Sequence, residues 1–256
     1  MIEAMVSLRE RRPGLPVALA LVVGEEEEGD GAQTLCKEYH FPWAVIGEPT
    51  DLQPCLSNYG YLEMQVLTRG RRRHASLAND GRNPIQDMLN LLLRYSGYMA
   101  SRPELVYNIR DLMSSPEGFV VPELCEAWID LHLPPASPLG EIARELEEVA
   151  AQAGRDDPGL LAEARLAGIH AGYQLSDQEP MARALREIYA QEGRPFQPRP
   201  FRSHSDANLL WAAGIKPLIL GPGRLEEAHA PEEWVDFGQV RQAAGLYFRL
   251  AEGLLS

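Results

Sequence analysis

The sequence predicts an α/β fold with a smaller α+β layer inserted into it, and three observations support this prediction. With 256 residues, 45% of them hydrophobic, the chain can bury one large core or two smaller ones. Apolar strand-like runs alternate with amphipathic helical segments towards both ends of the chain. Within residues 59–166 the strands instead alternate apolar and polar side chains, which is typical of a half-buried antiparallel sheet. We therefore expect one domain over residues 1–58 and 167–256 and a second over residues 59–166.

The first domain is expected to begin with a helix, followed by a β-α-β arrangement. Residues 2–12 place their apolar side chains on one helical face, and Pro13 ends that helix. Residues 17–23 (VALALVV) form a continuous apolar run, the pattern of a buried parallel strand. A helix over residues 32–39 and a second strand over residues 43–47 (WAVIG) are expected to follow.

The inserted layer is expected to alternate strands and helices. Residues 61–70 and 125–133 alternate apolar and polar side chains, as strands with one buried face do. Residues 84–99 and 139–154 repeat apolar side chains at helical spacing. The expected order of strand, helix, strand, helix and a last strand describes a small α+β layer.

The α/β rhythm is expected to return from residue 167 onward. Residues 181–193 and 206–214 are predicted to be helices that each end near a glycine. Residues 216–223 (KPLILGPG) are predicted to be a strand that runs into a glycine turn, and residues 240–255 to be the last helix.

Composition excludes several classes of partner. The formal net charge of -13 argues against nucleic acid and anionic membranes, because phosphate binding needs clustered Lys and Arg. The three cysteines are widely spaced without a CxxC, which favours a reduced, cytoplasmic protein. The most apolar run, residues 17–23, is far shorter than the ~20 residues that span a bilayer. No apolar signal-peptide core precedes the first charges.

Acidic residues and one histidine follow three of the predicted strands. The run GEEEEGDGA (24–32) follows the first strand, Glu48 the second, and His229 lies in the loop after the strand that ends in GPG. Because the carboxyl ends of parallel strands share one edge of a sheet, these side chains are expected to converge. Carboxylates and imidazoles are ligands of borderline divalent metals. Taken singly, a solvated acidic loop, a turn glutamate and a surface histidine are the alternative interpretations.

These segments belong to a longer series of motifs. In order they are GEEEEGDGA (24–32), GEP (47–49), GRRRHAS (70–76), GRN (81–83), SDA (205–207), GPG (221–223) and HAPEE (229–233). The series resembles the M20 family of metallopeptidases and deacylases, which includes acetylornithine deacetylase, succinyl-diaminopimelate desuccinylase and the carboxypeptidase G type. Three departures are Gly24, where the family often has Asp, His132, where the corresponding strand usually has Arg, and Phe119, where an Asn usually precedes V-V-P.

The resemblance implies a role for each matching residue. Glu25 would be the general base, and Glu26, Glu48 and His229 would be metal ligands. His74 would reach the active site of the partner subunit and polarise the scissile carbonyl there. Two divalent metal ions are implied in the complete enzyme, zinc first, with cobalt and manganese as alternatives. The expected substrate-binding residues are Asn83, His204, Gly221 and Gly223.

Two residues at the SDA motif, one just before it and one within it, have less specific interpretations. His204 is a candidate for contact with the substrate or for support of a ligand. Asp206 is interpreted as a cap of the helix that follows it.

The resemblance also implies the architecture. We expect an incomplete metallopeptidase-type catalytic domain, with a mostly parallel sheet flanked by helices, and an inserted α+β lid and dimerisation domain over residues 59–166. The family's upstream motifs H-x-D and D-M-K-G-G, which supply a histidine ligand and a bridging aspartate, are not found before the acidic run at residues 24–32. We therefore expect weak, at most mononuclear, metal binding and little activity from this polypeptide alone.

The expected function is metal-dependent cleavage of an amide bond by a homodimer. The substrate would be a small N-acyl amino acid or a peptide, and the enzyme a deacylase or a small-peptide carboxypeptidase. One alternative is a non-catalytic dimeric binding or regulatory protein, inactive because the upstream ligands are absent. Another is a purely structural dimerisation module. The enzyme is favoured because the sequence retains Glu25, Glu26, Glu48, His74 and His229.

Overall fold

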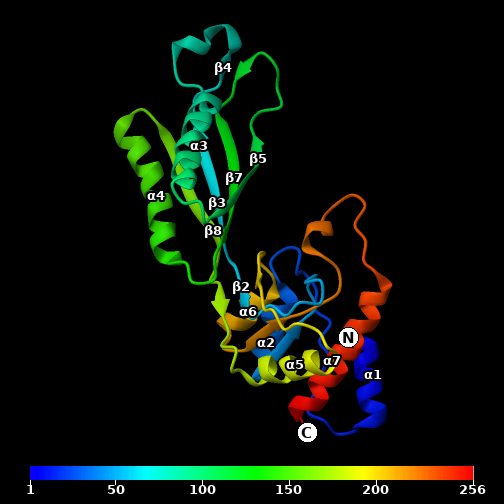
Figure 1. Ribbon diagram of the computed structural model, residues 1–256. Helices are drawn as coiled ribbons and strands as arrows, with labels where there is room; N and C mark the ends of the chain where they lie inside the picture. Colours follow the sequence, from blue (N-terminus) through cyan, green and yellow to red (C-terminus); the bar gives the residue numbers. More distant parts are fainter. Residues whose placement is uncertain (256) are drawn as a thin grey trace. The chain divides into compact units, whose positions relative to one another are not determined.

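The computed structural model describes residues 1–255 and divides the chain into two compact units (Figure 1). Unit 1 comprises Met1–Tyr59 together with the chain from Gly172 onward, and unit 2 comprises Gly60–Ala171. Helices flank the sheets in both units, which confirms the predicted α/β class. The assignment of one unit as a catalytic domain and the other as a lid stays a prediction.

Two small sheets lie within the described residues of unit 1. In the first, β1 (Trp43–Ile46) pairs in parallel with β11 (Lys216–Ile219). In the second, β2 (Ser57–Asn58) lies between β10 (Pro200–Phe201), to which it is parallel, and β9 (Tyr173–Gln174), to which it is antiparallel. The parallel β1/β11 pair carries the candidate site at its carboxyl edge.

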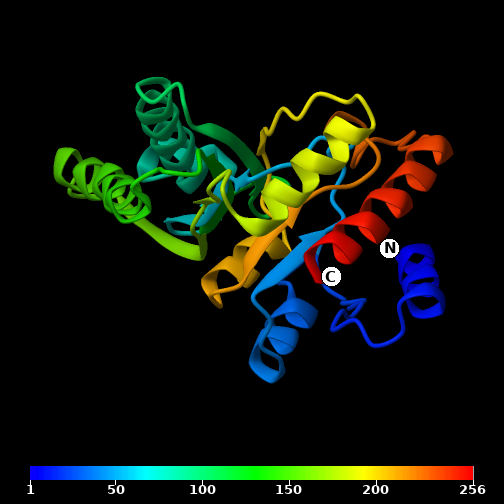
Figure 2. The ribbon, with the colours of Figure 1, turned by 60° about the horizontal axis from the view of Figure 1, so that its bottom comes forward.

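Five α-helices surround these strands within the described part of unit 1. They are α1 (Ile2–Arg11), α2 (Asp30–Glu38), α5 (Pro180–Gln191), α6 (Asp206–Ala212) and α7 (Phe237–Leu255). Figure 2 shows α1 and α5 beside α7, and α2 packs against α6. The core joins Leu218 and Ile219 of β11 to Leu185 of α5 and Leu246 of α7. No helix among residues 1–255 is both long and apolar enough to cross a membrane.

The prediction of a strand over residues 17–23 is wrong. The segment has no regular secondary structure, and the side chains of Leu21 and Val23 are 76% and 72% exposed. Its end is joined to α2 by one hydrogen bond, from the Gly31 amide to the Val23 carbonyl. A strand forms only when a neighbour completes its ladder of hydrogen bonds, and no described residue does so here.

Unit 2 is built on a four-stranded antiparallel sheet in the order β5-β7-β3-β8. Its strands are β5 (Val106–Met113), β7 (Leu124–Leu133), β3 (Gly60–Arg69) and β8 (Leu161–His170). Two helices pack against it, α3 (Pro84–Ala100) and α4 (Leu139–Asp156). A short antiparallel pair of β4 (Arg73–His74) and β6 (Val120–Val121) lies beside the 3-10 helix η1 (Ala75–Asp80).

The two faces of this sheet differ as the alternating sequence predicts. One face buries Met64 of β3 and Ile129 of β7 against Leu91 of α3 and Leu146 of α4. The opposite face carries the intervening polar residues. There the guanidinium of Arg110 pairs with Glu63 and Asp130, and the Tyr61 hydroxyl donates to Asp130. The side chains of Gln65 and Trp128 both donate to Glu126.

Candidate active site

The acidic run lies in a tight turn between the 17–23 segment and α2. Gly24 and Gly29 both have left-handed backbone, with φ of 78° and 67°. Glycine reaches this conformation without a steric penalty. The Gly29 amide donates to the Gly24 carbonyl at 2.7 Å and so closes the turn around Glu25 and Glu26.

Glu48 lies two residues after the end of β1, and Gly221 lies two residues after the end of β11, on the same edge of the parallel pair. The two chains meet closely at this point. A Cβ atom on Gly221 would lie 2.4 Å from the Glu48 carbonyl oxygen and 2.6 Å from that of Gly47. Only glycine fits such a contact, so the approach of the two strand ends requires Gly221.

His229 lies in the loop after β11, beyond the 3-10 helix η2 (Leu225–Glu227). Its backbone is left-handed, with φ of 60°, and its amide donates to the Glu233 carboxylate at 2.9 Å. The imidazole Nε2 lies 3.2 Å from a carboxylate oxygen of Glu26. Two predicted metal ligands, distant in the sequence, are thus in contact on the surface of unit 1.

The carboxylates of this region influence one another electrostatically. Burial, followed by the negative charges of Glu25, Asp206 and Glu26, raises the pKa of Glu48 to about 7. Burial also raises the pKa of Glu25, as do the charges of Glu26 and Asp206, while His229 acts in the opposite direction. The structure therefore gathers the predicted base and the predicted ligands into one acidic cluster.

Asp206 is a member of this cluster that the sequence analysis interpreted as a helix cap. That interpretation is wrong, because Ser205 caps α6: its hydroxyl accepts from the Ala207 amide at 3.2 Å. A carboxylate oxygen of Asp206 would instead lie 2.9 Å from a Cβ atom on Gly29, so the side chain faces the acidic turn. Burial raises the pKa of Asp206. The sequence contained a sign that Asp206 is not the cap, because Ser205, the residue before it, could itself cap the helix.

The donor types of the cluster suit a divalent metal ion. Carboxylates that raise one another's pKa hold negative charge that a cation would neutralise, and imidazole is a common ligand of zinc. Glu26 and His229 are in contact, whereas Glu48 is near them only at electrostatic range. No three His, Cys, Asp or Glu side chains within residues 1–255 stand close enough together to hold one ion.

The remaining predicted residues lie in several places. His74 lies on β4 of unit 2, is exposed and forms a hydrogen bond with the Ser76 hydroxyl at 2.8 Å. Asn83, also in unit 2, caps α3 by accepting from the Ile85 amide at 3.0 Å. His204 is half-buried just before α6. Gly221 and Gly223 lie at the end of β11, beside the turn that follows Glu48.

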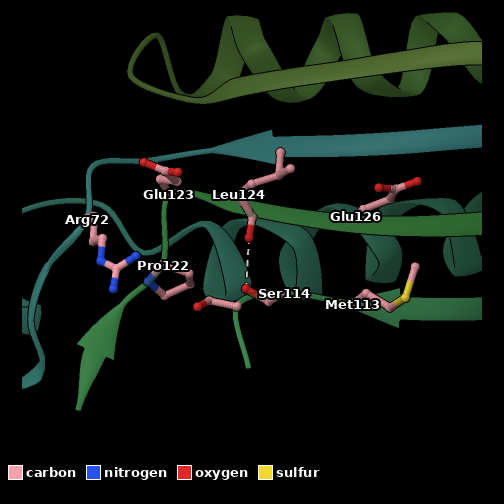
Figure 3. A pocket seen from close by; sticks show the side chains of 8 residues that line it. Arg72, Met113, Ser114, Pro122, Glu123, Leu124 and Glu126 are labelled. Carbon is pink, nitrogen blue, oxygen red and sulfur yellow. Dashed lines mark hydrogen bonds between the residues drawn. The ribbon is translucent and has the colours of Figure 1, made fainter. Parts of the chain in front are cut away.

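A separate hollow of about 290 Å³ lies in unit 2 and contains none of the predicted residues (Figure 3). It is lined by Arg72, Met113, Ser114, Ser115, Pro122, Glu123, Leu124 and Glu126. Its polar groups already interact, because Arg72 pairs with Glu117 and the Ser114 hydroxyl donates to the Leu124 carbonyl. The acidic cluster of unit 1 is the stronger candidate for chemistry.

The sequence profile of peptidase family M20/M25/M40 matches residues 1–253. The chain belongs to this peptidase family. The match confirms the resemblance that the motif series predicts, and it makes the protein a relative of hydrolases that act on amide bonds.

Two relatives illustrate the range of the family. The acetylornithine deacetylase of Proteus mirabilis is 24% identical over 221 residues, which cover 82% of this chain and 56% of the relative. A probable carboxypeptidase of Aspergillus flavus is 24% identical over 273 residues, which cover 99% of this chain and 61% of the relative. The chain thus spans little more than half the length of these M20/M25/M40 proteins.

Solved structures of other proteins share the fold. Aminopeptidase PepT from Bacillus cereus superposes with a TM-score of 0.74 at 17% identity, over 99% of this chain and 68% of that one. Human carnosine dipeptidase 1 gives a TM-score of 0.75 at 12% identity, over 99% of this chain and 69% of that one. At identities this low, the structural similarity shows that the fold is shared and nothing more.

Proposed function

We propose that this protein is a metal-dependent hydrolase of amide bonds, either an N-acyl amino acid deacylase or a small-peptide carboxypeptidase. The observation that carries the proposal is the acidic cluster of unit 1, in which Glu26 touches His229 and Glu25 and Glu48 lie within electrostatic reach. The names of the relatives, a deacetylase and a carboxypeptidase, support the same bond type. A small N-acyl amino acid or peptide is the proposed substrate.

Glu25 is the proposed general base. A carboxylate accepts a proton from water more readily when its pKa is raised towards neutrality. Burial and the charges of Glu26 and Asp206 raise the pKa of Glu25 in this way. The side chain is half-buried in the turn, so it can hold a proton next to a substrate and return it to the leaving amine.

Glu26, Glu48 and His229 are the proposed ligands of divalent metal ions, Glu26 of one ion and Glu48 of the other, with zinc as the first choice and cobalt or manganese as alternatives. Two such ions are proposed for the complete enzyme. A bound ion would supply a water of lowered pKa and a polarised substrate carbonyl. The chain's own contribution is to keep the imidazole of His229 against Glu26 and to keep Glu48 at the neighbouring strand end.

The second part of the proposal is a homodimer formed through unit 2, in which His74 serves the active site of the partner subunit. Two features support it: β5 and β8 are the free edges of the sheet, and Leu89 and Leu93 of α3 are 48% and 70% exposed. Sedimentation equilibrium should give a dimer that Leu93→Arg weakens. A monomer at all concentrations would contradict this part of the proposal.

The catalytic proposal is tested by assaying hydrolysis of N-acetyl amino acids and dipeptides with and without Zn²⁺, Co²⁺ or Mn²⁺. In the complete enzyme, Glu25→Gln should abolish turnover while metal binding persists. Glu28→Gln is the matched control, because Glu28 is an exposed residue of the same turn. Hydrolysis that survives Glu25→Gln would remove Glu25 from the role of base. Binding of metal and substrate without turnover by the unaltered protein would favour a binding or regulatory role.

A further inference from the structure

The turn that follows Glu48 has an unusual backbone. Asp51 and Leu52 are consecutive non-glycine residues with left-handed φ angles of 53° and 54°. A Cβ atom makes this conformation unfavourable, and it persists only where surrounding contacts hold it. Two sets of contacts do so here, and both reach the residues that follow β11.

The first set belongs to the backbone and Thr50. The Thr50 hydroxyl accepts from the Gly221 amide at 3.1 Å. The Leu52 amide donates to the Gly221 carbonyl at 3.0 Å, and the Asp51 amide donates to the Gly223 carbonyl at 2.6 Å. These bonds join the turn after β1 to the turn after β11.

The second set comes from one side chain in the first turn of α7. The amide of Gln239 accepts from the Gly223 backbone amide through Oε1 at 2.9 Å. It also donates to the Asp51 carboxylate through Nε2 at 2.7 Å. A primary amide carries both a donor and an acceptor, so Gln239 can bridge the two turns with a single side chain.

We infer that Gln239 is a positioning residue for the metal-ligand cluster, an inference that rests on the proposed function. Its amide fixes Gly223, the starting point of the loop that carries His229, relative to Asp51 in the turn that follows Glu48. Pro49, the neighbour of Glu48, would lie 3.5 Å from a Cβ atom on Gly223, so a shift of Gly223 would be transmitted to Glu48 through Pro49. Gln239 acts through these contacts and touches neither Glu48 nor His229.

The inference predicts two effects of Gln239→Ala. In metal-free protein the Asp51 and Gly223 amides should exchange with deuterium faster, because the strained turn opens more often. Co²⁺ affinity should fall by about 10-fold, with a changed visible absorption spectrum, as is typical when the support of a ligand is removed. Gln239→Glu keeps an acceptor for Gly223 but replaces the donor to Asp51 by a negative charge, and it should weaken Co²⁺ binding as well.

The matched control is Gln242→Ala, which changes an exposed residue of the same helix and should leave exchange and Co²⁺ binding unchanged. Asp51→Ala should reproduce the effect of Gln239→Ala, and the double variant should add little to either. Faster exchange with unchanged Co²⁺ affinity in Gln239→Ala would overturn the inference and leave the bridge a purely structural one. Absence of Co²⁺ binding by the unaltered protein would instead refute the proposed metal site itself.

Discussion

The imidazole Nε2 of His229 lies 3.2 Å from a carboxylate oxygen of Glu26, although the two residues come from opposite ends of unit 1. The contact depends on the conformation of the His229 loop. His229 has left-handed backbone, and the Glu233 carboxylate accepts from its amide. The loop is therefore held by Glu233 in the form that brings His229 to the acidic turn.

The first prediction concerns Glu233. Its replacement by alanine should release the His229 amide and let the loop leave its strained form, which separates His229 from Glu26. Zn²⁺ affinity measured by calorimetry should then fall by about 10-fold. Glu232→Ala, which changes the exposed neighbour in the same loop, should leave the affinity unchanged. Equal losses in both variants would mean that overall loop charge, and not the bond to His229, sets the affinity.

The second prediction concerns the dependence of stability on pH in the presence of a chelator. The pKa of Glu48 rises from 4.5 to about 7 in the folded protein. A carboxyl group with a raised folded pKa stabilises the protein below its unfolded pKa, and that stability is lost as pH rises through the folded pKa. The loss should amount to about 3 kcal/mol between pH 4.5 and 7.

The variant Glu48→Gln isolates this effect because glutamine does not ionise. Chemical denaturation at pH 8 should show the variant to be more stable than the unaltered protein, whereas the difference should vanish near pH 4.5. Parallel stability curves of the two proteins over this range would contradict the assignment of a raised pKa to Glu48.

The third prediction concerns the close contact of the two strand ends. Gly221→Ala would place a Cβ atom 2.4 Å from the Glu48 carbonyl oxygen, so the strands must separate. Unfolding experiments should show a loss of about 1–3 kcal/mol, the usual range for overpacking. Gly245→Ala in α7 is the control, because a Cβ atom there would meet nothing within 4 Å. That change should instead stabilise the helix by about 0.5–1 kcal/mol.

The fourth prediction concerns Asp206. Asp206→Asn removes a negative charge that raises the pKa of both Glu25 and Glu48. The pKa of each should therefore fall, which a ¹³C NMR titration of the side-chain carboxyl carbons would detect. Asp177→Asn, at an exposed site before α5, should leave both titrations unchanged. Unaltered pKa values of Glu25 and Glu48 in Asp206→Asn would place Asp206 outside the cluster.

The sequence predicts the helices and the paired strands of this fold well because their signals are local. The apolar period along α3 and α4, and the alternation along β3 and β7, arise within each element and need no knowledge of its neighbours. Residues 17–23 show the limit of such reasoning. Their composition suits a strand, but a strand also needs a partner, and periodicity holds no information about one.

The strand β5 was not predicted for a related reason, whereas a last strand was expected, without bounds, after the helix over residues 139–154. β5 lies at an edge of the unit 2 sheet and most of its side chains are exposed on both faces, so little alternation remains to be read. At the site, the positions of Glu25, Glu26, Glu48 and His229 after their predicted strands led to the expectation that these side chains converge. The approach of Asp206 could not be predicted, because it depends on how closely α6 packs against Gly29.

The central claim of this account is that the Glu26–His229 pair, with Glu48 at the neighbouring strand end, binds divalent metal ions. Calorimetric titration of the metal-free protein with Zn²⁺ tests it most directly. The account predicts saturable binding that weakens by at least about 10-fold in Glu26→Gln and in His229→Ala. It predicts no change in His40→Ala, which removes an exposed histidine. Equal Zn²⁺ affinity in all of these proteins would contradict the claim.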